Sequence, residues 1–178
     1  SIATTDMFYR FKKHDDGKYI YTKDRGWFFE KNLIENLNCF EGKRILDYKL
    51  PEYHSDIPMM IFSPSVVNDG RRLLISPQKI TFLCNTDTSL FSGKIALENI
   101  EFSTLFNKND PQYLKISSAM RMNATFPYIL PMVFLPSEPK IEVMDAGLRD
   151  NLGLTTSIKY IDNFKNWIHE HTSGVVII

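Results

Sequence analysis

Cysteine is scarce in this sequence. Its two cysteines, Cys39 and Cys84, allow at most one disulfide, and neither belongs to a Cys-x-x-Cys motif that would bind metal or carry out redox chemistry. Free cysteine behaves as a small hydrophobic residue, so we expect two buried thiols. The four histidines lack the spacing of metal ligands. The sequence therefore predicts neither a metal site nor a bound cofactor.

Net charge and long apolar runs are also missing. Lysine plus arginine and aspartate plus glutamate number 21 each, so no overall positive field attracts nucleic acid. The longest nearly uncharged stretch, 126–137, is shorter than the about 20 residues that span a bilayer, and prolines interrupt it. No basic start followed by an apolar run marks a secretion signal. We expect a soluble chain, cytoplasmic or peripheral to a membrane, with no nucleic-acid partner.

The first half of the chain alternates between strand and helix patterns. Two aromatic-rich runs on either side of an Asp-Gly turn predict a hairpin over 7–22. Apolar residues every four positions predict a helix over 27–38. Short apolar runs predict strands, of which the first should be covered on both faces, at 57–62, 71–75 and 81–84. Residues 85–110 show no clear period, and we expect mostly loop there with one short helix.

The second half has clearer patterns. Helical spacing is present over 114–124, a strand pattern over 140–144, and a long amphipathic helix pattern over 151–172 with Asn151 as its N-cap. Residues 175–178 are a further apolar strand pattern. This strand-helix-strand order predicts an α/β layer architecture whose sheet is at least partly parallel. Because domains seldom end within an apolar strand, we expect residues 1–178 to be one part of a single domain, truncated at both ends.

Asp145 is the leading candidate for chemistry. It follows a predicted strand directly and precedes two small residues, Ala146 and Gly147. In open α/β sheets, ligands and catalytic groups gather beyond the carboxyl ends of strands, and small residues there leave room for a substrate. A structural interpretation competes with this one, because an aspartate in a turn often only accepts hydrogen bonds from nearby backbone amides.

The segments around Asp145 resemble those of patatin-like phospholipases. Residues 144–153, MDAGLRDNLG, are similar to the second active-site block of that family, in which an aspartate and two small residues precede an Asn-x-Gly helix start. Residues 117–131, SSAMRMNATFPYILP, are similar to the preceding block, a helix of small residues that ends in Phe-Pro. The segments 24–30 and 58–72 follow the order expected for bacterial members. The resemblance thus covers nearly the whole chain.

This resemblance implies a fold and an activity. The fold would be the C-terminal portion of a patatin-like domain, a three-layer α/β/α sandwich with a largely parallel central sheet. The activity would be lipid acyl hydrolysis by a Ser-Asp dyad, in which the carboxylate takes the proton of the attacking serine and backbone amides hold the oxyanion. Asp145 would be the aspartate of that dyad. The family commonly has glycine where Ala146 stands, and alanine fits there only if its φ is negative.

The serine is not in this sequence. No Gly-x-Ser-x-Gly motif and no glycine-rich run occurs, so the nucleophile and oxyanion hole are expected in the remainder of the parent protein. The chain alone should be inactive. Ala146 and Gly147, together with Phe126 and Pro127, are candidate substrate contacts. Apolar side chains of 126–134 suit either an acyl-chain wall or ordinary core packing.

Two functions are therefore carried forward. In the first, this chain supplies the aspartate of a phospholipase or esterase that acts on lipid or acyl-ester substrates and contacts a membrane surface transiently. In the second, it is a non-catalytic binding or scaffold domain that keeps the patatin-like fold without the serine. A Gly-x-Ser-x-Gly motif upstream of residue 1 in the intact protein would favour the first.

Overall fold

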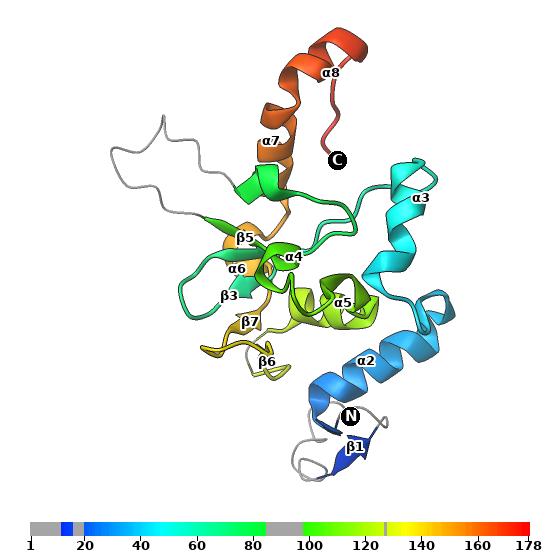
Figure 1. Cartoon of the computed structure of the whole chain (residues 1–178), viewed down its shortest axis with the longest axis vertical. Coiled ribbons are helices and arrows are strands. Elements are labelled where there is room, and N and C mark those ends of the chain that lie inside the picture. Colours follow the sequence, from blue (N-terminus) through cyan, green and yellow to red (C-terminus); the bar gives the residue numbers. More distant parts are fainter. Residues whose placement is uncertain (1–11, 16–19, 85–97, 127) are drawn as a thin grey trace.

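The protein is a mixed α/β structure built around a five-stranded sheet (Figure 1). The computed structural model describes residues 12–15, 20–84, 98–126 and 128–178. The strands are β1 (Lys13–Asp15), β2 (Ile20–Thr22), β3 (Ser65–Val66), β4 (Arg72–Leu74), β5 (Asn99–Glu101), β6 (Val133–Phe134) and β7 (Glu142–Met144). The α-helices are α2 (Arg25–Asn36), α3 (Lys49–Tyr53), α4 (Phe102–Leu105), α5 (Ile116–Ala124), α6 (Gly147–Asp150), α7 (Leu154–Asn163) and α8 (Lys165–His171). The 3-10 helices of the described residues are η2 (Asn38–Phe40), η3 (Ile45–Tyr48), η4 (Thr81–Cys84) and η5 (Pro111–Tyr113).

The main sheet is mixed, with the strand order β5-β4-β3-β7-β6. Among the described strands, only β4 and β5 pair in parallel, whereas β3 pairs with β4 and with β7, and β6 with β7, in antiparallel fashion. The expectation of a largely parallel sheet is therefore wrong for the described strands. The connections explain why. Neither the turn between β3 and β4, which contains Gly70 at φ +74°, nor the short loop between β6 and β7 is long enough for a parallel crossover.

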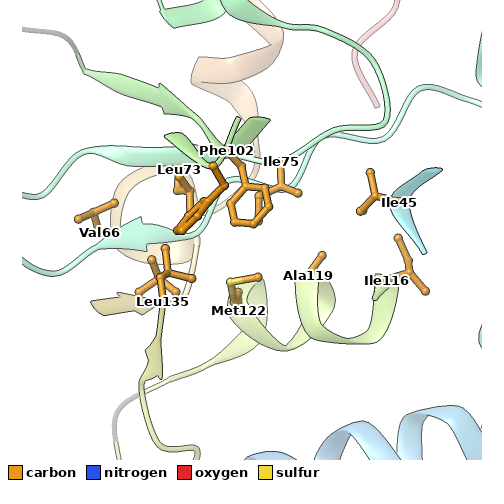
Figure 2. Packing of buried hydrophobic residues seen from close by; sticks show 11 residues of the cluster. Ile45, Val66, Leu73, Ile75, Phe102, Ile116, Ala119, Met122 and Leu135 are labelled. Atoms are coloured by element: carbon orange, nitrogen blue, oxygen red, sulfur yellow. The ribbon is translucent and has the colours of Figure 1, made fainter. Parts of the chain in front are cut away.

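Helices cover both faces of this sheet, and strand β4 shows the division. Leu73 points toward α5 and belongs to the larger core cluster, in which Met122, Ala119 and Ile116 of α5 face the sheet (Figure 2). Leu74, on the opposite face, packs with Ile80 and Leu83 in a second cluster that Tyr160 of α7 covers. The layered α/β architecture predicted from the sequence is confirmed at this coarse level, with the sheet between α5 and α7.

Two predicted strands are absent, and polar contacts account for both. Residues 57–62 form only one bridge, from Phe62 to Ile75, because Pro58 has no N–H and the Met60 amide donates to the Glu52 carboxylate at 2.8 Å. Residues 81–84 form the 3-10 helix η4. Its start is held by the Glu101 carboxylate, which accepts hydrogen bonds from the Ile80 amide at 3.1 Å and the Thr81 hydroxyl at 2.5 Å.

The long helix predicted over 151–172 is divided. Gly153 at φ +67° separates α6 from α7, and Phe164 separates α7 from α8. Asn151 continues the backbone of α6 and does not cap a helix. The capping role predicted for Asn151 is filled by Asp150, whose carboxylate accepts the amides of Thr155 and Thr156 at 2.9 Å each. The predicted strand at 175–178 is also wrong, because these residues pair with no described strand and are exposed.

Other predicted elements are found close to their expected positions. The hairpin is present as β1 and β2, paired antiparallel, although residues 7–11 and 16–19 of the expected hairpin lie outside the described residues. The helix expected over 27–38 is α2, which begins two residues earlier because the Asp24 side chain caps it by accepting the Trp27 amide at 2.8 Å. The expected helix 114–124 is α5, and the strand 140–144 is β7. In the described part of the chain, no helix is long and apolar enough to cross a membrane.

The central position of Leu73 gives a test of this fold. We expect Leu73→Ala to lower the free energy of unfolding by about 3 kcal/mol, because it leaves a cavity where the side chain is fully buried. Leu50→Ala is the matched control, since Leu50 is 66% exposed and should change stability by less than about 0.5 kcal/mol. Urea unfolding followed by circular dichroism measures both. Equal effects of the two substitutions would contradict the assignment of the core.

Candidate functional site

Asp145 lies directly after β7, where two segments far apart in the sequence meet. Its amide donates to the carbonyl of Thr125 at 2.8 Å, and the next amide, that of Ala146, donates to the carbonyl of Asn123 at 3.2 Å. The end of β7 is thereby joined to the end of α5. Phe126 follows Thr125 and is about half exposed, whereas Pro127 lies outside the described residues. Tertiary folding thus brings Asp145 and Phe126, two of the predicted site residues, into one region.

The Asp145 side chain is oriented by its own backbone. Oδ1 accepts the Gly147 amide at 2.6 Å, and the side chain is partly exposed. No hydrogen bond from a described residue reaches Oδ2, and no described serine hydroxyl bonds to the carboxylate. The Ser65 hydroxyl instead donates to the Asp145 backbone carbonyl at 2.9 Å. One carboxylate oxygen is therefore held in place while the other is left without a partner among these residues.

Ala146 and Gly147 shape the backbone beside this carboxylate. Ala146 is buried, with φ −64° and ψ −31°, so the negative φ that an alanine requires at this position is present. Gly147 has no room for a side chain. A Cβ there would lie 2.6 Å from Asp145 Oδ1 and 2.8 Å from Asn151 Oδ1. Glycine is needed at 147 for this close approach of the two side chains, and neither Ala146 nor Gly147 offers a side chain of its own for substrate contact.

This geometry is compatible with both interpretations of Asp145. A carboxylate that accepts the amide two residues later is a common turn arrangement. The same bond also fixes the direction of Oδ2, and a fixed carboxylate could take a proton from a hydroxyl that came within hydrogen-bond reach. The site is incomplete in itself, because no described nucleophile contacts it.

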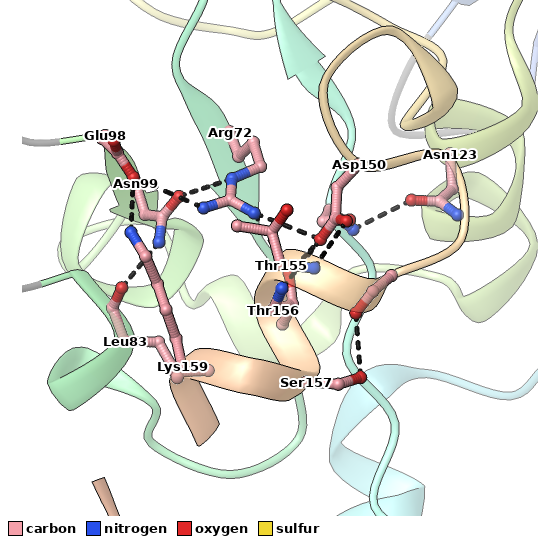
Figure 3. Close-up of polar contacts among 12 residues, drawn as sticks. Arg72, Leu83, Glu98, Asn99, Asn123, Asp150, Thr155, Thr156, Ser157 and Lys159 are labelled. Atoms are coloured by element: carbon pink, nitrogen blue, oxygen red, sulfur yellow. Dashed lines mark hydrogen bonds and ion pairs between the residues drawn. The ribbon is translucent and has the colours of Figure 1, made fainter. Parts of the chain in front are cut away.

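A buried ion pair supports the segment that follows Asp145 (Figure 3). Arg72 of β4 points to the α7 face of the sheet, and its Nη1 lies 3.1 Å from Oδ2 of Asp150. The two side chains are only 4% and 3% exposed. Asp150 also accepts the Thr156 hydroxyl at 2.7 Å in addition to two amides at the start of α7. One carboxylate therefore joins β4, α6 and α7.

Further partners saturate the guanidinium of Arg72. Its Nε donates to Asn99 Oδ1 at 2.8 Å, and Asn99 in turn donates to the Leu83 carbonyl at 2.6 Å. Glu98 lies 3.8 Å from Nη2 of Arg72 and also pairs with Lys159 of α7. The hydrogen bond from Lys159 is the main cause of a lowered Glu98 pKa. This network is structural, because its carboxylates are occupied by donors from the chain itself.

The pKa of Asp150 is lowered despite its burial. Burial acts to raise this pKa, but the hydroxyl of Thr156, the amides of Thr155 and Thr156 and the positive charge of Arg72 together outweigh it. The ionised form of Asp150 therefore stabilises the folded state. Sequence reasoning overlooked this pair. Its available signal was the arginine at position 72 within an otherwise apolar strand pattern, since a charged residue in a core strand needs a buried partner.

A second polar cluster joins α2 to α5. Arg121 of α5 lies 3.4 Å from Asp24 and 3.3 Å from Glu30, and Glu30 also accepts hydrogen bonds from Ser117 and Ser118. Gly26 lies so close that a Cβ there would be 2.1 Å from the guanidinium carbon. The segments 24–30 and 117–131, which carry part of the family resemblance, are thus in direct contact.

The described cysteines and the described metal-ligating side chains provide no metal centre and no activated thiol. Among those residues, no group of three histidine, cysteine, aspartate or glutamate side chains could hold a metal ion. Cys39 is exposed, which contradicts the expectation of two buried thiols. Cys84 is half-buried, and burial raises the pKa of its thiol to about 11. A thiol with so high a pKa is a poor nucleophile at neutral pH.

Comparison with known proteins assigns neither a family nor a function to this chain. No family model, no curated protein and no solved structure matches this chain.

The Arg72–Asp150 pair gives a test of the support beneath Asp145. We expect Asp150→Asn to destabilise the protein by about 3 kcal/mol at neutral pH, because it leaves the buried guanidinium without its closest counter-charge. The free energy of unfolding is measured by urea denaturation. The control is Asp162→Asn, which removes an exposed carboxylate of α7 that pairs with the exposed Lys165, and should change stability by less than about 0.5 kcal/mol.

The same pair predicts a dependence on pH. Because the folded-state pKa of Asp150 lies below the ordinary value of 3.8, its contribution to stability is fully present above that value and is lost as pH falls through the folded-state pKa. The stability difference between the wild type and Asp150→Asn should therefore be constant near neutrality and shrink in acid. A difference that grew in acid would refute the stabilising role of the ionised carboxylate.

Proposed function

We propose that this chain supplies the general base, Asp145, of a patatin-like lipid acyl hydrolase whose serine lies in another part of the parent protein. The observation that carries the proposal is the state of the Asp145 carboxylate: Oδ1 is held by the Gly147 amide, while Oδ2 has no partner among the described residues, and Asp145 as a residue is partly exposed. A base must be oriented, yet have an acceptor free for the proton it takes. Asp145 meets both requirements.

In each half of the reaction, the Asp145 carboxylate takes up one proton and then gives it back. As a serine Oγ forms its bond to the ester carbonyl carbon, its proton passes to Oδ2. The proton then moves to the leaving alcohol when the ester C–O bond breaks, which leaves an acyl-enzyme. Water attacks the acyl-enzyme in the second half, and the carboxylate again accepts and returns one proton. Backbone amides stabilise both oxyanions. Those amides and the serine would come from outside the 178 residues.

The surface beside Asp145 suits an apolar substrate. Phe126, Tyr128 and Ile129 lie in the segment that follows the Thr125–Asp145 contact, and all three are exposed, at 49%, 95% and 62%. Exposed large apolar side chains in a segment joined to a candidate site favour an acyl chain or the surface of a lipid aggregate. We propose Phe126 as a substrate contact, with Ala146 and Gly147 providing space by their small size. Transient contact with a membrane surface through this segment follows from the same proposal.

A second function remains compatible with the same contacts. The bond from the Gly147 amide to Oδ1 is sufficient to explain Asp145 as a turn residue, as expected if the domain only binds or supports other parts of the protein. Activity measurements on the intact protein separate the two functions.

The direct test is Asp145→Asn in the intact protein. Asparagine keeps the Oδ1 acceptor for Gly147 but cannot take a proton, so we expect kcat for a short p-nitrophenyl ester to fall by about 100- to 10,000-fold, with the melting temperature nearly unchanged. Asp162→Asn, an exposed carboxylate of α7, is the control and should keep wild-type turnover. Full activity in Asp145→Asn would exclude Asp145 from the mechanism. Ester turnover by the purified 178-residue chain alone would show that the nucleophile is within it.

Gly147→Ala tests how closely the base is held. The new Cβ would meet Asp145 Oδ1 at 2.6 Å, so the carboxylate must turn away from its present direction. We expect kcat to fall on the order of tenfold while KM changes little, because misplacing a catalytic group affects the transition state more than substrate binding. A raised KM with unchanged kcat would instead make position 147 part of the substrate contact surface.

A further inference from the structure

A pocket separate from Asp145 is lined by residues of α3, of the segment that follows it, and of α7 with its C-cap Phe164. Its volume is about 670 Å³. The residues that matter for its chemistry are Glu52, Asp56, Tyr53, Phe82, Tyr160 and Phe164. Among the described residues that line it there is no lysine, arginine or histidine. The pocket is therefore acidic and aromatic at once.

Three aromatic rings form one wall of this pocket. The ring centroids of Phe82 and Phe164 are 5.2 Å apart, those of Phe82 and Tyr160 are 5.8 Å apart, and those of Tyr160 and Phe164 are 4.9 Å apart. Phe82 meets both other rings edge-on, which is the favoured arrangement for aromatic pairs. The rings therefore hold one another in place. Their faces carry partial negative charge and attract cations.

Glu52 supplies an unneutralised carboxylate. It is 9% exposed, and its Oε1 accepts the Met60 amide at 2.8 Å. Its Oε2 is buried and has no hydrogen-bond partner among the described residues. The side-chain amide of Gln78 lies near Glu52 and acts to lower its pKa. Its Nε2, however, donates to the Lys49 carbonyl at 2.7 Å. Burial raises the pKa of Glu52, against the smaller lowering effects of Met60 and Gln78.

A second buried carboxylate, that of Glu101, shows how hydrogen-bond donors of this chain surround a carboxylate with a structural role. Glu101 is 4% exposed, and its two oxygens receive hydrogen bonds from the Ile80 amide and from three hydroxyls, those of Thr81, Ser103 and Thr104. These donors lower the pKa of Glu101 against the effect of burial. Glu52 has no comparable set of donors. A buried carboxylate without donors is costly, and a bound cation would remove that cost.

We propose that this pocket binds a small organic cation with a quaternary ammonium group. The positive charge neutralises Glu52 and Asp56, and the methyl groups pack against Phe82, Tyr160 and Phe164. An ammonium without N–H groups fits better than a metal ion, because aromatic carbons cannot replace the six or more oxygen ligands of calcium or magnesium. It also fits better than a neutral apolar ligand, which would leave Glu52 buried and unpaired. The proposal does not depend on the proposed function, since Asp145 and its neighbours do not line the pocket.

The experiment compares choline with its neutral isostere 3,3-dimethyl-1-butanol, each titrated into the 178-residue chain by isothermal calorimetry. The two compounds have the same shape and hydroxyl group but differ in charge. We expect choline to bind at least about tenfold more tightly, which corresponds to about 1.4 kcal/mol. Equal affinity would show that the pocket recognises only apolar surface and would overturn the proposal. No detectable binding of choline at concentrations up to about 20 mM would also overturn the proposal.

Substitutions of residues that line the pocket test whether the preference for choline over its neutral isostere arises there. Glu52→Gln keeps an acceptor for the Met60 amide and should reduce the preference for choline to nearly equal affinity. Its matched control is Glu35→Gln on α2, an exposed carboxylate outside the pocket that should keep wild-type selectivity. Phe164→Leu, at a position 37% exposed, should weaken choline more than the isostere without loss of fold. Full selectivity in either Glu52→Gln or Phe164→Leu would overturn the proposed site, and the second variant decides if the first fails to fold.

Discussion

The buried pair between Arg72 and Asp150 is the contact on which the arrangement of this protein depends. A guanidinium in the middle of a sheet is tolerable only when acceptors surround it, and here they come from β5, from the end of α6 and from the start of α7. Asp150 lies five residues after Asp145. The segment that carries Asp145 is therefore held at one end by the pairing of β7 and at the other by this ion pair.

Helix α5 supplies the second support for the same segment. The carbonyls of Asn123 and Thr125 accept the amides of Ala146 and Asp145. Arg121, one turn earlier, joins α5 to Glu30 of α2 and to Asp24, the residue that caps α2. The position of the Asp145 backbone thus depends on contacts between residues distant in sequence, most of them between backbone groups, while the Gly147 amide orients its carboxylate.

Four carboxylates in this structure differ chiefly in how many donors they receive. Asp150 and Glu101 are surrounded by amides and hydroxyls, have lowered pKa values and act as structural centres. Glu52 and Asp145 each have one oxygen held by an amide and the other without a partner among the described residues. The chain can satisfy a carboxylate where it needs one for stability, so the two that it leaves incomplete are the natural candidates for function.

The sequence by itself determined the elements whose signals are local. The period of apolar residues predicted α2 and α5, and an aspartate after an apolar run correctly indicated Asp145 at the end of a strand. Tertiary structure decided the direction of the strands, the break at Gly153, the donors of Asp150 and the unpaired oxygen of Glu52. The reason is separation along the chain. Arg72 and Asp150 are 78 residues apart, and no local pattern specifies which buried charge will meet which partner.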